Sequence, residues 1–269
     1  MTSSAAAAES LLAFWADAGV DAMLLDEPVD RIALGRVVPP RPPERKLAPA
    51  PAAPASAAVT PDLSAALAEA HRLAAAAPDL EALKAAIEAF DGCPLKFEGA
   101  ARQSVFYRGA LDAPLMVIGE GPGQEEDLRG EPFVGRAGQL LDKMLGAAGL
   151  NGRAFITNSV FWRPPGNRNP TAAEQMVCAP FLERAVALLK PRMLLLVGGP
   201  SAKSMLKREE GILALRGRWF EWRSEDGSIE LPALPTLHPA FLLRQPAAKK
   251  KAWSDLQTLA ERLDRPHRD

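Results

Sequence analysis

Short apolar runs alternate with segments of helical spacing over the C-terminal two-thirds of the chain. The apolar runs predict buried strands at 115–119, 154–160, 192–197 and 228–237, the last paired in a hairpin with 218–223. Apolar residues that recur every three or four positions predict helices at 137–149, at 171–190, from about 200, and at 246–264. Because parallel strands are joined by helices that cover both faces of their sheet, we expect an α/β fold of three αβα layers. Its central sheet is predicted to be four-stranded and mainly parallel.

The N-terminal part of the chain follows a different pattern, which predicts a helical extension. Residues 8–24 have apolar positions at helical spacing, and alanine-rich helices are expected near 62–76 and 79–90. Prolines recur among alanines between these segments, and because proline blocks helices, the stretch predicts an extended linker. The predicted divisions are an N-terminal helical segment, a Pro/Ala-rich linker and a main domain with its core at about 90–262, which are residues 1–35, 36–61 and 62–269.

Glycine-rich or polar residues follow three of the predicted core strands. The stretch GEGPG at 119–123 ends the first strand, Asn158 lies near the end of the second, and His238 follows the fourth. Because ligands of parallel α/β sheets bind beyond the carboxyl ends of the strands, we expect these segments to line one site. GEGPG does not match the GxGxxG fingerprint, which argues against a dinucleotide.

Each candidate residue also has a purely structural interpretation. The glycines serve tight turns as well as close approach of a ligand, and Phe133, just before a helix, suits the core as well as stacking on a planar base. Asn158 can satisfy a turn or read a pyrimidine edge, because an amide donates and accepts at once. His238 can donate a hydrogen bond to developing negative charge.

Composition and charge exclude several classes of protein. The 269 residues contain only two cysteines, which exclude a disulfide framework, and no ligand spacing typical of a metal site occurs. No apolar run reaches the roughly eighteen residues of a membrane span and no secretory signal is evident, so we expect a cytoplasmic protein. No acidic residue occurs between Asp142 and Glu174 or between Glu230 and Asp255, and such stretches suit phosphate contact as well as an ordinary surface.

Taken together and in this order, the motifs resemble the uracil-DNA glycosylase superfamily, in particular its class with an iron–sulfur cluster (family 4). The resemblance covers about residues 90–262. The matching motifs are GEGPG at 119–123, GEPFVGRAGQLL at 130–141, ITN at 156–158, RPPGNRNPT at 163–171 and HPAFLLR at 238–244. The resemblance implies hydrolysis of the N-glycosidic bond of deoxyuridine in DNA, with no lysine nucleophile and therefore no lyase step.

The resemblance also implies roles for individual residues. Phe133 is expected to stack on the flipped uracil, Asn158 to read its edge, and His238 to stabilise negative charge on uracil O2. Glu120 is expected to activate or position water, and Asn167 is a secondary candidate for this task. The remaining expected roles are close substrate contact for Gly121 and Gly123, a wedge into the duplex for Leu242, and phosphate contacts for Arg163, Arg168 and Arg244.

The chain departs from the family pattern at the iron–sulfur cluster. The family has four cysteine ligands, whereas here Cys93 and Cys178 match two of them, and Phe90 and Trp162 stand at the other two positions. Two thiolates do not hold a cubane cluster, so we predict that the chain binds no cluster and no other metal.

The expected partner is uracil-containing DNA, bound by a monomer. The alternative is a module of the same fold that binds uracil-containing, abasic or single-stranded DNA without turnover. The missing cysteines favour this alternative, whereas the presence of Glu120, Phe133, Asn158 and His238 argues against it.

Overall fold

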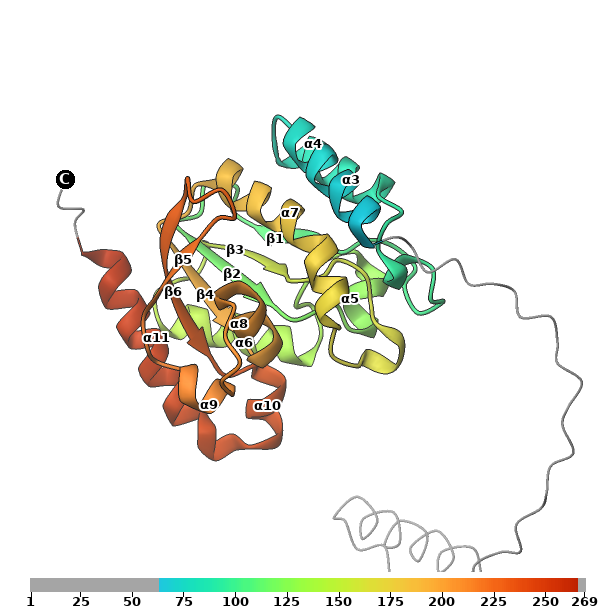
Figure 1. Ribbon diagram of the computed structural model, residues 1–269. Coiled ribbons are helices and arrows are strands. Elements are labelled where there is room, and N and C mark those ends of the chain that lie inside the picture. The colour runs from blue at the N-terminus through green and yellow to red at the C-terminus, as the bar shows by residue number, and fades with distance from the viewer. Residues whose placement is uncertain (1–62, 266–269) are drawn as a thin grey trace, which may run out of the picture. The chain divides into compact units, whose positions relative to one another are not determined.

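A central sheet organises the protein (Figure 1). The computed structural model describes residues 63–265, so the predicted segments 1–35 and 36–61 lie outside the described residues. Within this range six strands form one mixed sheet in the order β1-β3-β2-β4-β6-β5. The four central strands run parallel and are β3 (Ala154–Asn158), β2 (Leu115–Gly119), β4 (Met193–Val197) and β6 (Glu230–Thr236). The predicted α/β fold and its four-stranded parallel centre are confirmed.

Two antiparallel strands extend this centre at its edges. β5 (Phe220–Arg223) pairs with β6 as the predicted hairpin, and β1 (Tyr107–Gly109) pairs with β3. The sequence did not predict β1, because three half-buried or exposed residues are too few to show a periodic pattern.

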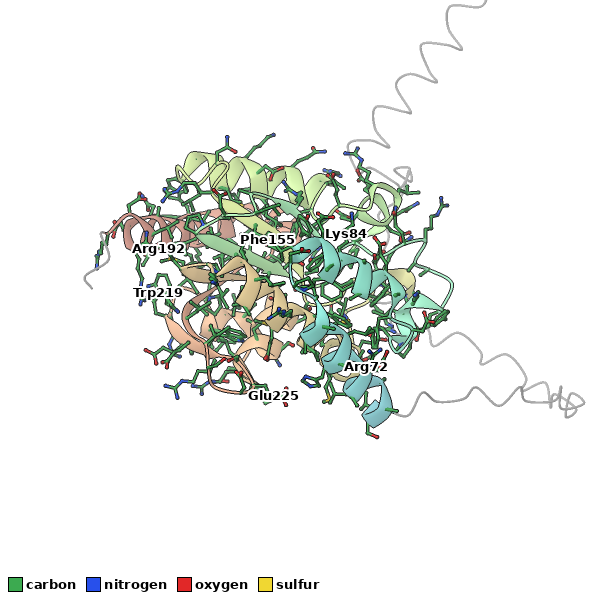
Figure 2. All side chains as sticks on the ribbon, turned by 90° about the horizontal axis from the view of Figure 1, so that it is seen from above. Arg72, Lys84, Phe155, Arg192, Trp219 and Glu225 are labelled. Carbon is green, nitrogen blue, oxygen red and sulfur yellow. The ribbon has the colours of Figure 1, made fainter. Side chains whose placement is uncertain are left out.

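Alternate side chains of the central strands point to two separate cores, one on each face of the sheet. On the first face Met116, Ile118 and Phe155 pack under α3 (Leu63–Ala76), α4 (Leu80–Ala89) and α7 (Ala172–Leu189). Figure 2 shows Phe155 in the interior and Lys84 on α4, on the outside of this layer. The N-terminal helices predicted near 62–76 and 79–90 therefore belong to the layer on this face, where both pack against α7.

On the opposite face Leu115, Val117 and Ile156 pack under α6 (Arg136–Ala147) and α11 (Lys249–Asp264). Strands β2, β3 and β4 are buried along their whole length because both faces are covered, which explains their unbroken apolar runs. Several short elements complete the fold: α8 (Gly199–Leu206), α9 (Ile212–Leu215), α10 (Pro239–Arg244), η1 (Pro94–Lys96), η2 (Pro165–Asn167) and η3 (Pro246–Ala248).

One helix lies outside the predicted elements. The acidic stretch 124–131 contains α5 (Gln124–Arg129). Its three acidic residues in the first turn suit the positive end of a helix dipole, and Gly130 ends it in a left-handed conformation (φ 75°). Among the helices of residues 63–265, none is both long and apolar enough to cross a bilayer.

Candidate active site

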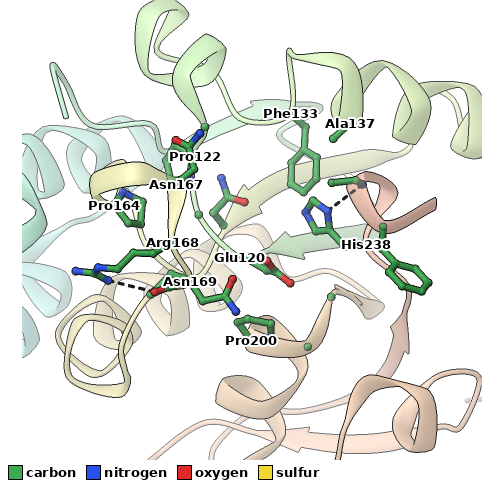
Figure 3. Close-up of a pocket in the computed structure, with 18 of the residues that line it drawn as sticks. Glu120, Pro122, Phe133, Ala137, Pro164, Asn167, Arg168, Asn169, Pro200 and His238 are labelled. Carbon is green, nitrogen blue, oxygen red and sulfur yellow. Dashed lines mark hydrogen bonds between the residues drawn. The ribbon is translucent and has the colours of Figure 1, made fainter. Parts of the chain in front are cut away.

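A cavity of about 790 Å³ opens where the central strands end (Figure 3). It lies beyond the carboxyl ends of β2, β3, β4 and β6, as predicted for a parallel sheet. Every site residue predicted from the sequence lines it except Arg163 and Leu242. The structure thus brings together residues that are more than 100 positions apart in the chain.

The end of β2 is shaped so that an aromatic ring and an amide meet there. Gly119 is paired with Asn158 of β3, and a Cβ atom on Gly119 would collide with both the Phe133 ring and the side-chain oxygen Oδ1 of Asn158. Phe133 and Asn158 are 5% and 2% exposed, respectively. Among the described residues none forms a hydrogen bond with the Asn158 amide, so its donors and acceptor are available to a ligand in the cavity.

The backbone of Phe133 is held in an unusual conformation. Its φ of 56° is left-handed, which costs free energy for a bulky residue. Arg108 on β1 donates hydrogen bonds to the carbonyl oxygens of Pro132 (2.7 Å) and Phe133 (3.2 Å), and it pairs with Asp142 at 2.6 Å. Gly138 leaves room for the Phe133 carbonyl, with which any Cβ there would collide. These contacts fix the direction of the Phe133 ring.

Glu126 joins the two loops that carry the site. Its carboxylate accepts hydrogen bonds from the N–H of Gly135 (2.9 Å) and the N–H of Gly123 (3.1 Å), which lie on the PFVG and GEGPG loops. Glu126 was not singled out from the sequence. The available signal was its position three residues after Gly123, where a glutamate caps the start of a helix.

Glu120 is a carboxyl group in a largely buried setting. Burial raises the pKa of Glu120 to about 7, while a hydrogen bond from the Gly199 N–H and the positive charge of Arg244 oppose the rise. Gly198 (φ 98°) lies against the carboxyl group so closely that a Cβ atom would collide with it. At neutral pH this group is therefore poised between its acid and its carboxylate form.

His238 is a neutral imidazole at the start of α10. Its Nδ1 accepts a hydrogen bond from the Ala240 N–H at 3.2 Å, which leaves the ring proton on Nε2. Burial, together with the positive charge of Arg244, lowers the pKa of His238 to about 4. The ring lies against Phe133, with centroids 5.7 Å apart and planes inclined by 29°.

The asparagines of the 163–170 loop differ in their surroundings. Asn167 (φ 54°) lines the cavity, but its Oδ1 accepts a hydrogen bond from Arg163 Nε at 2.7 Å. In Figure 3 the amide of Asn169 points toward the carboxyl group of Glu120. Asn169 was not singled out from the sequence, because nothing in a turn-rich segment shows which side chain faces inward.

Two residues predicted to contact DNA have surroundings that the sequence did not indicate. Leu242 is fully buried against Leu237 and Ala252, so it does not present a wedge, whereas its neighbour Leu243 is 38% exposed. Arg168 forms a two-pronged ion pair with the buried Glu174 at 2.6 and 2.9 Å and is joined by Glu98 at 3.2 Å. These ion pairs hold the loop to α7.

The region predicted to replace the cluster is packed with aromatic rings. Cys93 and Cys178 are free, fully buried and close to each other. Burial, and then the neighbouring Cys93 thiol, raise the pKa of the Cys178 thiol. Phe90 lies 6.4 Å from Trp162 between ring centroids. Within residues 63–265 no group of three or more His, Cys, Asp or Glu side chains is placed to hold a metal, so this donor set does not fit a four-thiolate cluster.

Comparison with known proteins agrees with the geometry of the cavity. A profile of the Uracil DNA glycosylase superfamily matches residues 106–257, more than half of the chain. The chain belongs to the uracil-DNA glycosylase superfamily. The matched range contains β1 to β6 and every element that lines the cavity, so the membership covers the whole site.

Three similar proteins share one name. A "Type-4 uracil-DNA glycosylase" of Pyrobaculum aerophilum is 38% identical over 66% of this chain and 91% of its own length. Proteins of the same name from Saccharolobus solfataricus and Thermotoga maritima are 36% and 34% identical over 58% and 61% of this chain, and over 74% and 83% of their own lengths. This uracil-DNA glycosylase superfamily member thus resembles the type-4 proteins over more than half of its length.

Proposed function

We propose that the protein is a monofunctional uracil-DNA glycosylase, which hydrolyses the N-glycosidic bond of a flipped-out deoxyuridine, releases uracil and leaves an abasic site. The observation that carries the proposal is one cavity, at the carboxyl ends of the central strands, that joins a neutral imidazole, a free amide and an aromatic ring. Superfamily membership and the names of the relatives support the same activity.

Base selection falls to Phe133 and Asn158. A flipped base needs a ring to stack on, which offsets the few kcal/mol that unstacking costs. The Asn158 amide accepts from uracil N3–H and donates to O4, whereas cytosine offers the opposite pattern on that edge. Gly121 and Gly123, which line the cavity, allow the substrate to approach the backbone closely.

His238 stabilises the leaving group. When the C1′–N1 bond breaks, its electron pair passes into the uracil ring, and negative charge develops on O2. The Nε2–H of a neutral, immobilised imidazole donates to that oxygen, and such a prearranged donor is worth about 2.7–4 kcal/mol.

Glu120 positions and deprotonates the attacking water. The carboxylate form orients a water molecule toward C1′ and accepts its proton while the new C–O bond forms. Asn169 points toward Glu120 and is the better-placed partner for this water, while Asn167 is held by Arg163. Among the described residues that line the cavity there is no lysine to attack C1′, which supports a reaction without a lyase step.

We further propose that the chain binds no 4Fe–4S cluster. The buried Cys93–Cys178 pair and the rings of Phe90 and Trp162 support a packed, apolar replacement. Iron and labile-sulfide assays on anaerobically purified protein test this, and about four irons per chain overturn it. A monomer in the cytoplasm, where DNA and reduced thiols are both found, completes the proposal.

The direct test of function is uracil release from a labelled oligonucleotide, compared with His238→Ala and Asn158→Ala. We expect the intact protein to turn over and both variants to lose most activity while their unfolding curves stay close to that of the parent. DNA binding without release establishes the alternative, a non-catalytic module, which the missing cysteines favour. Unchanged rates in both variants refute the roles proposed for His238 and Asn158.

A further inference from the structure

A group of lysines lies outside the proposed catalytic machinery. Lys249, Lys250 and Lys251 fill the first turn of α11, and Lys143 lies on α6; together they form what we call the lysine surface. All four are exposed, and within residues 63–265 none of them forms an ion pair. Lys143, Lys249 and Lys250 border a hollow of about 360 Å³ with Met144 and Trp253.

This arrangement is unfavourable in the isolated protein. The first turn of a helix carries partial positive charge, and α11 has no acidic residue there to balance it. Three consecutive cations add their own repulsion. An anionic partner is the simplest source of compensation.

The lysine surface adjoins the active-site cavity through a single short helix. Phe241 and Arg244 of α10 line the cavity, while Leu242 of the same helix lines the hollow beside Lys249 and Lys250. A helix is about 10–12 Å across with its side chains, so the two sites are neighbours. Figure 1 shows α11 beginning next to α10.

We infer that the lysine surface binds backbone phosphates of the duplex that flank the flipped nucleotide. The inference rests on the proposed function, because a nucleotide in the cavity brings its duplex against α10. DNA carries one negative charge per roughly 1.7 Å of helix axis, so phosphates lie within reach on both sides of that helix. Continuity with the cavity favours DNA over an acidic peptide, the other anionic partner that fits the hollow.

The test is the salt dependence of DNA binding by Lys249→Gln/Lys250→Gln. Phosphate contacts are independent of sequence, so anisotropy with a labelled, uracil-free 30-base-pair duplex measures them without turnover. Each phosphate that a lysine neutralises contributes roughly 0.9 to the slope of log K against log salt, so removing two lysines is expected to lower the slope by about 1.8. If parent and variant bind equally at 1 M salt, this slope change corresponds to a roughly 60-fold lower affinity of the variant at 0.1 M salt.

Lys84→Gln/Lys190→Gln is the matched control, because both lysines are exposed and belong to the layer on the opposite face of the sheet. It is expected to leave the slope unchanged. An unchanged slope in the Lys249/Lys250 variant overturns the inference, as does binding of a labelled aspartate-rich peptide in place of DNA. If the intact protein binds the duplex through these lysines but releases no uracil, the proposed function is refuted, whereas the inference that the lysine surface binds DNA is supported.

Uracil release gives a second readout. The Lys249/Lys250 variant is expected to raise KM for a uracil-containing duplex several-fold with kcat unchanged, and to leave release from a five-nucleotide single strand at the parental rate. Equal losses on both substrates contradict a contact with flanking phosphates.

Discussion

The Nδ1 atom of His238 accepts a hydrogen bond from the main-chain N–H of Ala240, at 3.2 Å. Because this bond uses the lone pair of Nδ1 and burial lowers the pKa of the ring to about 4, the imidazole stays neutral and keeps its proton on Nε2. The start of α10 therefore both caps a helix and prepares a hydrogen-bond donor that faces the cavity.

Replacing His238 with alanine is expected to lower kcat about 100- to 1,000-fold, the equivalent of one prearranged donor, with little change in KM. Single-turnover uracil release measures the change. A loss confined to KM contradicts stabilisation of the leaving group, since it indicates a binding contact only.

The pKa of about 7 for Glu120 predicts a pH dependence of activity. If the carboxylate form is needed, kcat/KM of the intact protein rises about tenfold per pH unit below pH 7 and levels off above it. His238 is already neutral throughout this range, so its titration does not change kcat/KM above pH 5. In Glu120→Gln, kcat/KM is expected to be low and independent of pH. If kcat/KM of that variant still rises with pH, a group other than Glu120 is responsible for the pH dependence.

The raised pKa of Glu120 also predicts how the stability of the protein changes with pH. A carboxyl whose pKa is raised on folding contributes stability below its unfolded value of 4.5, and that contribution is lost as the pH rises through about 7. At pH 8 Glu120→Gln is therefore expected to be more stable than the parent by about 1–3 kcal/mol, and at pH 4 the two should be equal. Urea unfolding at the two pH values measures this difference. Equal stability at both pH values contradicts the raised pKa.

Arg108 is expected to act through Phe133. Arg108→Ala removes the hydrogen bonds that hold the carbonyls of Pro132 and Phe133, so the ring loses its fixed direction and uracil release falls about tenfold. In a Phe133→Ala background the same substitution should have little further effect, because the ring that it orients is gone. Additive losses in the double variant point to a general loss of stability instead.

Leu242 and Leu243 are expected to respond in opposite ways. Leu242→Ala opens a cavity in a packed cluster and costs about 2–5 kcal/mol of stability. Leu243→Ala should leave stability nearly unchanged, because this side chain is exposed. We expect Leu243 rather than Leu242 to wedge into the duplex, so the substitution should slow uracil release from duplex DNA more than from single strands. Thermal unfolding and parallel assays on both substrates separate the two. Equal slowing on both substrates contradicts the wedge.

Much of the fold was predictable because its signals are local. Apolar runs marked the four parallel strands, helical spacing marked α6, α7 and α11, and parallel topology placed Glu120, Asn158 and His238 at one edge of the sheet. β1 and α5 were missed, since a three-residue edge strand and a six-residue polar helix carry no apolar period.

The order of residues along the chain determined the layers of the fold, the position of the cavity and the residue types that meet there. The reason is that short stretches of neighbouring residues are enough to set the periodicity of each element and the alternation of strands with helices. Only the tertiary structure decided that Leu243 rather than Leu242 is exposed, that Arg168 is held by Glu174, and that Arg108 supports Phe133. It also shifted the pKa of Glu120 upward and that of His238 downward. Burial and ion pairing depend on partners that are distant in sequence, so the residues next to a site in the chain do not predict them.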